Sequence, residues 1–143
     1  CSEPAMTIDI LPTIAQITGA KLPNHKIDGK DIWPLMKGEK NAKSPHEAYY
    51  FYWGTNLHAV RKDKWSLHLP HSYRSLNGKP GTGGIPGKTQ QKKTDTALFD
   101  LRMDISQKSD LSEKHPDIVK NLKALGKKHI AYVKENNREP AKP

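Results

Sequence analysis

Short runs of aromatic and β-branched residues between Pro45 and Pro70 constrain the fold of this chain more than any other feature. The first run spans Tyr49 to Trp53, the second spans Leu57 to Arg61, and the third begins at Trp65, with turn-forming residues between them. Such runs predict β-strands joined by hairpins. A later run from Ala97 to Leu101 predicts a fourth strand. The chain is therefore expected to build a four-stranded antiparallel sheet.

Alternation along the second run predicts which side chains share a face. Leu57, Ala59 and Arg61 fall on one face, and His58 and Val60 on the other, because successive side chains of a strand point to opposite sides. One face is expected to pack and the other to be partly exposed. His58 and Arg61 are accordingly expected to pack or to form surface ion pairs rather than to contact a ligand.

A long C-terminal helix is predicted from Pro116, and it should lie across the sheet. Apolar or ring-bearing residues recur there at helical spacing: Ile118, Leu122, Leu125, His129 and Val133. Gly126 weakens this helix by about 1 kcal/mol relative to Ala, so a kink or fraying is expected there. We expect the sheet–helix interface to be filled by Trp33, Trp53 and Trp65. The fold class is thus α+β, with residues 137–143 forming a polar, disordered tail.

The segment before Pro45 predicts two short helices. Asp9 is a plausible N-cap, Pro12 suits a first turn, and Gly19 suits a helix end. Between these positions, one apolar face is expected from Ile10, Leu11, Ile14 and Ile17. A second, shorter helix is expected to be capped by Asp31 and to stop at Gly38.

The stretch from His71 to Thr94 interrupts the strand pattern. It holds five glycines, two prolines and five Lys or Arg residues, and it has no acidic residue. This composition predicts a long loop rather than a simple hairpin connection. Loops longer than about 12–15 residues are usually functional or disordered.

Charge and length limit the functions to consider. The chain has 143 residues, an apolar fraction of 34% and a net charge of +9, which favours attraction to polyanions such as nucleic acids, anionic membranes or sulfated glycans. No apolar run approaches the roughly 20 residues needed to cross a membrane. A single cysteine, Cys1, cannot form an internal disulfide, and because the chain begins with it we expect a fragment of a longer protein.

Three familiar kinds of site are disfavoured by the residues present. His68 and His71 are three positions apart, which in one strand would direct them to opposite faces, and no carboxylate accompanies them, so no metal site is predicted. The glycine-rich segment from Gly81 to Thr89 does not match a phosphate-binding loop, because Thr82 stands where the motif needs Gly and Pro86 lacks a backbone N–H donor. Nucleic-acid binding is disfavoured because the aromatic residues are not interleaved with the basic ones.

Several motifs of the chain, taken in order, carry a family resemblance. They are Asp9-Ile10-Leu11-Pro12-Thr13, Asp28-Gly29, Asp31-Ile32-Trp33-Pro34-Leu35, Tyr49 to Gly54, Lys64 to His68, and Leu98-Phe99-Asp100-Leu101 with Asp104 beyond. This series resembles the C-terminal part of the type I sulfatases, with the strand at Tyr49 most similar to the arylsulfatase A and N-acetylgalactosamine-6-sulfatase branch. The chain departs from the family at Ser106-Gln107, where a Gly-Glu pair is usual.

The resemblance implies that the catalytic groups lie in an N-terminal domain outside this chain. Residues 1–44 would end the N-terminal α/β sulfatase domain, to which the first helix would belong, and residues 45–136 would form the C-terminal subdomain. Family members use a formylglycine nucleophile and calcium. No catalytic residue is expected here, because Cys1 lacks the C/S-x-P/A-x-R motif. No metal ligand is expected either, because the family's ligands lie in the N-terminal domain and no Asp-Asp or Asp-Asn pair of that kind occurs in this chain, so the fragment alone should be inactive.

The full-length enzyme implied by the resemblance would hydrolyse sulfate esters, on sulfated glycans or aryl sulfates, in a periplasmic, secreted or lysosomal setting. This chain would help to form the substrate pocket through His71, Tyr73 and Arg74, because a guanidinium binds an oxyanion bidentately and a tyrosine ring stacks on a sugar. Alternatively, His71 and Arg74 face solvent or cap the strand. A further alternative is a free-standing basic module that binds polyanionic glycans without catalysis.

Overall fold

A computed structural model describes residues 1–137 of the chain. The predicted disordered tail falls almost wholly on residues 138–143, which lie outside this range. The chain divides into two compact units, Cys1–Tyr49 and Tyr50–Pro143, and each is described by itself.

The first unit contains the short helices that the sequence predicts. A 3₁₀ helix η1 spans Thr7–Asp9, α1 spans Ile10–Thr18 and α2 spans Trp33–Met36. Gly19 ends α1 with a φ of 70°, a left-handed conformation that glycine adopts without strain. Asp31 was predicted to cap α2, but the N-cap position is occupied by Ile32; Asp31 precedes it and accepts a hydrogen bond from the backbone N–H of Trp33 at 2.8 Å.

The apolar face predicted for α1 is not the face that this unit buries. Ile10, Leu11, Ile14 and Ile17 are 52%, 54%, 52% and 49% exposed, respectively. The buried positions of α1 are instead Pro12, Thr13 and Ala15. The helix is therefore amphipathic in the expected way, but its apolar side has no cover within its own unit.

The second unit is built on the predicted antiparallel sheet. Its strands are β1 (Tyr49–Trp53), β2 (Asn56–Lys62), β3 (Trp65–His68) and β6 (Ala97–Asp100), in the spatial order β1-β2-β3-β6. Val60 pairs with Leu67, and Leu67 pairs with Leu98. All three side chains have no exposed surface, so the core of this unit runs through the middle of the sheet.

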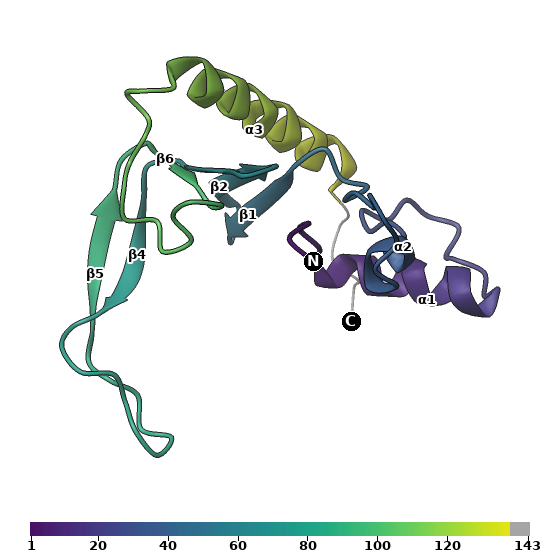
Figure 1. The fold of residues 1–143 in the computed structure, drawn as a ribbon, viewed down its shortest axis with the longest axis horizontal. Coiled ribbons are helices and arrows are strands. Elements are labelled where there is room, and N and C mark those ends of the chain that lie inside the picture. Colours follow the sequence, from purple (N-terminus) through teal and green to yellow (C-terminus); the bar gives the residue numbers. More distant parts are fainter. Residues whose placement is uncertain (138–143) are drawn as a thin grey trace. The chain divides into compact units, whose positions relative to one another are not determined.

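Helix α3, which spans Pro116–Asn136, runs along this sheet (Figure 1). The sheet and the packed helix confirm the predicted α+β class. The helix is uninterrupted through Gly126, where it packs closely against β2: a Cβ there would come 2.9 Å from Leu57 Cδ2 and 3.3 Å from Val60 Cγ2. No helix within residues 1–137 is both long and apolar enough to cross a bilayer.

The faces predicted for β2 need correction. Leu57 and Val60 both lie beside Gly126, although strict alternation assigns them to opposite faces. Ala59 and Val60 are adjacent and both buried, which also departs from a two-residue period. Which side chains of β2 are buried therefore depends on the structure packed against each side of the strand, and not on alternation alone.

The predicted loop from His71 to Thr94 is an ordered hairpin, and this prediction was wrong. Strand β4 (His71–Leu76) pairs with β5 (Thr89–Thr94) in register, from His71 opposite Thr94 to Leu76 opposite Thr89. At the tip, Thr82 bridges to Ile85 across Gly83 and Gly84, whose φ values of 58° and 80° suit a two-residue hairpin turn. Figure 1 shows the hairpin extending away from the four-stranded sheet and α3.

Candidate functional site

A cavity of about 320 Å³ lies where the β4–β5 hairpin joins the four-stranded sheet. It is lined by side chains from three parts of the second unit: Trp53, His58, Ser72, Tyr73, Arg74 and Gln91. Its volume falls at the lower end of the range of about 300–1,000 Å³ typical of small-molecule pockets. Aromatic rings, an imidazole and a guanidinium therefore meet in one concave space.

Three histidines stack at the base of the hairpin. The ring centroids of His58 and His71 are 4.1 Å apart with planes at 18°, and those of His68 and His71 are 5.7 Å apart at 21°. The expectation that His68 and His71 face opposite ways was wrong. His68 ends β3 and His71 begins β4, so the turn at Leu69-Pro70 separates them and alternation does not carry across it.

Hydrogen bonds orient two of these imidazoles. His71 donates from Nδ1 to the carbonyl oxygen of Leu69 at 2.6 Å, and His68 donates from Nε2 to Oε1 of Gln107 at 2.6 Å. Both donors are assigned from the chemistry of their partners, since a carbonyl or amide oxygen can only accept. The Nε2 atom of His71 is thereby left as the nitrogen that can accept a proton or a hydrogen bond.

Two of the stacked histidines, His58 and His68, have pKa values below the ordinary value for an imidazole. Burial lowers the pKa of His58, and the charge of a protonated His71 lowers it further. Burial also lowers the pKa of His68, and this outweighs its hydrogen bond to Gln107, which favours the protonated form. Arg74 brings a guanidinium group to the lining of the cavity.

The three residues predicted to bind substrate lie close together but not on one face. His71 and Tyr73 share a face of β4, with ring centroids 6.1 Å apart. Arg74 lies on the opposite face by alternation, opposite Gln91 in the register. Tyr73 and Arg74 both line the cavity, whereas His71 reaches it through its stack on His58. Their role in binding stays a prediction.

Two cavity residues were missed by the sequence reasoning. Trp53 was expected at the sheet–helix interface, yet its side chain is 78% exposed and lines the cavity. His58 was expected to pack or to form an ion pair; it does pack, against the ring of His71, and it also lines the cavity beside the hairpin. The position of Trp53 next to Gly54, at a strand end, was the available signal, because strand ends adjoin loops rather than the core.

No cluster of potential metal ligands is found in the part of the chain that the structure describes. Within residues 1–137, no three His, Cys, Asp or Glu side chains gather in a way that could hold a metal ion. Cys1 is exposed and outside any such group.

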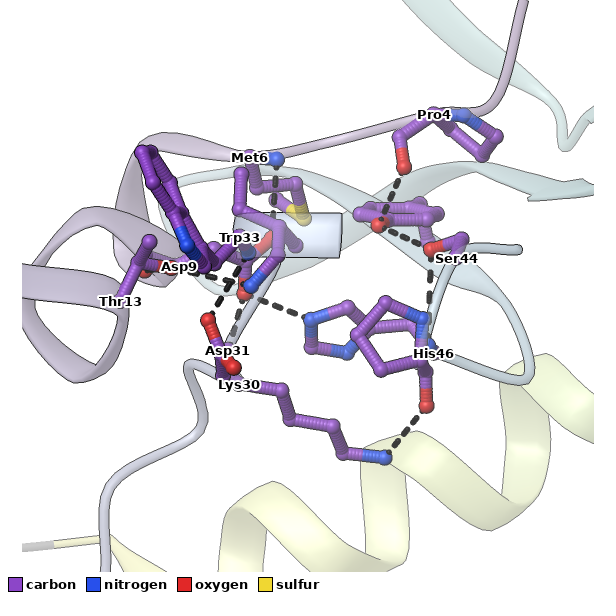
Figure 2. A network of polar contacts seen from close by, with 12 residues as sticks. Pro4, Met6, Asp9, Thr13, Lys30, Asp31, Trp33, Ser44 and His46 are labelled. Carbon is purple, nitrogen blue, oxygen red and sulfur yellow. Dashed lines mark hydrogen bonds and ion pairs between the residues drawn. The ribbon is translucent and has the colours of Figure 1, made fainter. Parts of the chain in front are cut away.

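A second polar cluster surrounds Asp9 in the first unit, and its arrangement indicates a structural role (Figure 2). The fully buried carboxylate accepts hydrogen bonds from Met6 N at 3.1 Å, from Lys30 N at 2.9 Å and from His46 Nε2 at 2.6 Å. Burial raises the pKa of Asp9, but these hydrogen bonds outweigh it, so the pKa lies below its ordinary value. Asp9 thus ties three distant segments of the unit together.

Comparison with known proteins relates most of the chain to one family. Residues 44–142 match the family described as the C-terminal region of aryl-sulfatase. The steryl-sulfatase of Rattus norvegicus is 30% identical over 152 residues, an alignment that covers 93% of this chain and 26% of that protein. The chain thus spans about a quarter of the length of the curated relatives it matches.

Solved structures share the fold. The PsFucS1 sulfatase from Pseudoalteromonas sp. superposes with a TM-score of 0.68 at 20% identity, over 92% of this chain and 26% of that one. The structure of Ps i-CgsB in complex with k-i-k-neocarrahexaose gives a TM-score of 0.59 at 22% identity, over 90% of this chain and 25% of that one. At these identities the likeness establishes the architecture alone.

Proposed function

The chain belongs to the sulfatase family as an aryl-sulfatase C-terminal region, and from that premise we propose that the whole protein is a sulfuric ester hydrolase whose substrate pocket this chain helps to form. The observation that carries the proposal is the cavity at the base of the β4–β5 hairpin. It opens on an ordered hairpin whose root is anchored by the stack of His58 on His71.

The chemistry of the cavity suits a sulfated sugar. The guanidinium of Arg74 can bind a sulfate or carboxylate with two parallel hydrogen bonds, which a lysine cannot do. Tyr73 and Trp53 each present an exposed ring that can lie against the apolar face of a pyranose. His71, through Nε2, supplies a further hydrogen-bonding group near the cavity.

A glycan is favoured over a small aryl sulfate as the substrate. Two exposed rings and one guanidinium line the cavity, and this is more contact surface than a single aromatic ester would use. The related Ps i-CgsB has been solved with k-i-k-neocarrahexaose, an oligosaccharide. A small aryl sulfate remains the second candidate, since several relatives are arylsulfatases.

The cofactors of the family do not fit the residues described. Formylglycine would need a C/S-x-P/A-x-R motif that Cys1 lacks, and no group of ligands suited to a metal ion assembles within residues 1–137. We assign both formylglycine and calcium to a part of the sulfatase polypeptide outside this sequence. The 143-residue chain alone is then expected to be inactive on sulfate esters.

The missing partner is the N-terminal sulfatase domain. On this proposal residues 1–44 end that domain and residues 45–136 form the C-terminal subdomain. The half-exposed isoleucines of α1 support this assignment, because an apolar stripe of this kind is normally covered by neighbouring structure.

The test is the substitution Arg74→Gln in the complete sulfatase polypeptide. Loss of one bidentate contact should raise KM for a sulfated oligosaccharide by about 10-fold, which corresponds to about 1.4 kcal/mol. The kcat should change little, since Arg74 holds the substrate rather than the reacting atoms.

The matched control is Arg102→Gln, which removes an exposed arginine from the turn after β6. It should leave KM unchanged. Equal effects of the two substitutions, or wild-type KM in the Arg74 variant, would show that the cavity takes no part in binding.

A further inference from the structure

The β4–β5 hairpin carries unpaired positive charge along its length. Its five cations are Arg74, Lys79, Lys88, Lys92 and Lys93, and no acidic residue lies between His71 and Thr94. Among the described residues none of the five forms an ion pair, whereas Lys43 and Lys64 are paired with Glu3 and Asp100 at 2.9 and 2.7 Å. The charge of the hairpin is therefore available to a partner.

The strand register divides these cations between two faces. Lys92 lies directly opposite Tyr73, and Lys88 lies opposite Asn77, whose N–H donates to the Lys88 carbonyl at 2.8 Å. Lys88 and Lys92 are four residues apart on the same face, so their backbone positions are about 13 Å apart. The face that carries Tyr73 thus bears two spaced cations that lead from Tyr73, at the cavity, toward the tip, whereas Arg74 and Gln91 line the cavity from the opposite face.

The β4–β5 hairpin has a regular, paired backbone. Six consecutive residue pairs join its strands, and the turn at its tip is closed by the bridge between Thr82 and Ile85. At Gly81 a Cβ would come 1.9 Å from the carbonyl oxygen of Ile85, so the two sides of the tip touch through their backbones. Lys88 and Lys92 are consequently held at a set spacing.

We propose that the face of the hairpin bearing Tyr73, Lys88 and Lys92 is a second binding site, which holds anionic groups of a linear sulfated or carboxylated glycan beyond the sugar in the cavity. This inference rests on the proposed function and narrows its substrate to a polymer with repeated negative charges. The chemistry fits, because lysines act as point charges that tolerate variable placement of an anion, while Tyr73 offers a ring to one sugar.

A single exposed ring on this face argues against nucleic acid as the partner. Single-stranded nucleic acids are held by aromatic residues that stack successive bases along a basic groove. Beyond Tyr73 and toward the tip, the residues of this face are Ser75, Asn77, Lys88 and Gln90. These side chains donate hydrogen bonds to sulfate, carboxylate or hydroxyl groups, but they offer no stacking platform.

The test compares two double variants of the complete sulfatase polypeptide. K88Q/K92Q removes the two hairpin charges, and K123Q/K127Q removes two exposed charges from α3. KM is measured for a long sulfated oligosaccharide and for 4-nitrophenyl sulfate at several salt concentrations. K88Q/K92Q should raise KM for the oligosaccharide at least about 5-fold at low salt and flatten its salt dependence, since fewer ionic contacts remain to be screened. Its KM for 4-nitrophenyl sulfate should match wild type.

Other results would overturn the inference. An unchanged KM for the oligosaccharide would do so, as would an equal rise in K123Q/K127Q. Heparin binding, measured without turnover, distinguishes failure of the hairpin site from failure of the proposed sulfatase function. If the wild-type protein hydrolyses neither ester, and K88Q/K92Q binds heparin more weakly than wild type while K123Q/K127Q does not, the sulfatase proposal fails and the anion site stands. A larger loss for single-stranded DNA than for heparin would identify a nucleic-acid surface instead.

Discussion

At the residue scale, the most constrained side chain is Asp9. Its carboxylate has no exposed surface and accepts hydrogen bonds from Met6, Lys30 and His46 (Figure 2). A buried carboxylate is tolerated only when its oxygens are satisfied, and here backbone N–H groups supply two of the three bonds. The sequence marks Asp9 as a plausible helix cap, whereas the structure uses its side chain to join segments up to 37 residues apart.

Asp9→Asn is expected to lower the free energy of unfolding by about 1–3 kcal/mol, because an uncharged amide loses charge-assisted bonds and turns an NH₂ group toward a donor. The pKa of Asp9 is depressed in the folded chain, so its stabilisation is complete above its unfolded pKa of about 3.9 and is lost as the pH falls through the folded value. Denaturant titrations between pH 3 and 7 should show this acid loss in wild type and not in the variant.

The exposed Asp95 provides the control. Asp95→Asn should keep both the neutral-pH stability and the acid sensitivity of wild type. If Asp9→Asn behaves in the same way, the buried cluster contributes nothing measurable to the stability of its unit.

Gln107 helps to orient the histidine stack from a loop outside the hairpin. It adopts a φ of 52°, which is unusual for a residue other than glycine, and its side chain accepts the Nε2–H of His68. His68 in turn lies against His71, so a loop residue after β6 helps to orient the stack beside the cavity. Ser106-Gln107 stands where a Gly-Glu pair is usual in the family that the chain resembles, and through Gln107 this departure lies beside the histidine stack.

At the scale of elements, α3 and β2 are fitted to one another at Gly126. Replacing this glycine by leucine should destabilise the second unit by about 1–3 kcal/mol, since a side chain there meets Leu57 and Val60 at less than normal contact distance. Ala124→Leu, at an exposed position of the same helix, is the matched control and should be close to neutral. Thermal unfolding of both variants distinguishes close packing from simple helix propensity, which would favour leucine over glycine at position 126.

Local signals were enough to predict the four sheet strands and the three helices, because cap residues, turn residues and apolar spacing lie within each element. They failed for the β4–β5 hairpin, whose strands are polar and whose glycines suggested a loop. Exposed strands need no apolar alternation when pairing alone orders them. The stack of His58, His68 and His71 could not be predicted either, since it depends on how the turn at Leu69-Pro70 directs the hairpin.

At the scale of the whole molecule, the apolar stripe of α1 is the largest departure from the packing that the sequence predicts for the first unit. The side chains of Ile14 and Ile17 are about half exposed, although the sequence spaces them as a packing face. The spacing predicts that such a face will be covered, but it cannot say which polypeptide covers it. On the proposed function, the cover is the N-terminal sulfatase domain.

The double substitution Ile14→Gln/Ile17→Gln is therefore expected to act differently in two contexts. In the 143-residue chain it should change the free energy of unfolding by less than about 0.5 kcal/mol and reduce self-association, because both side chains already face water. In the complete sulfatase it should cost about 1.5–3 kcal/mol for each side chain, because their burial against the missing domain is lost. Ala15→Gln separates the two effects: Ala15 is 7% exposed within its own unit, so this substitution should destabilise both forms. A double variant that is harmless in both would mean that α1 keeps its apolar face in solvent, and residues 1–44 would then have no place in an N-terminal domain.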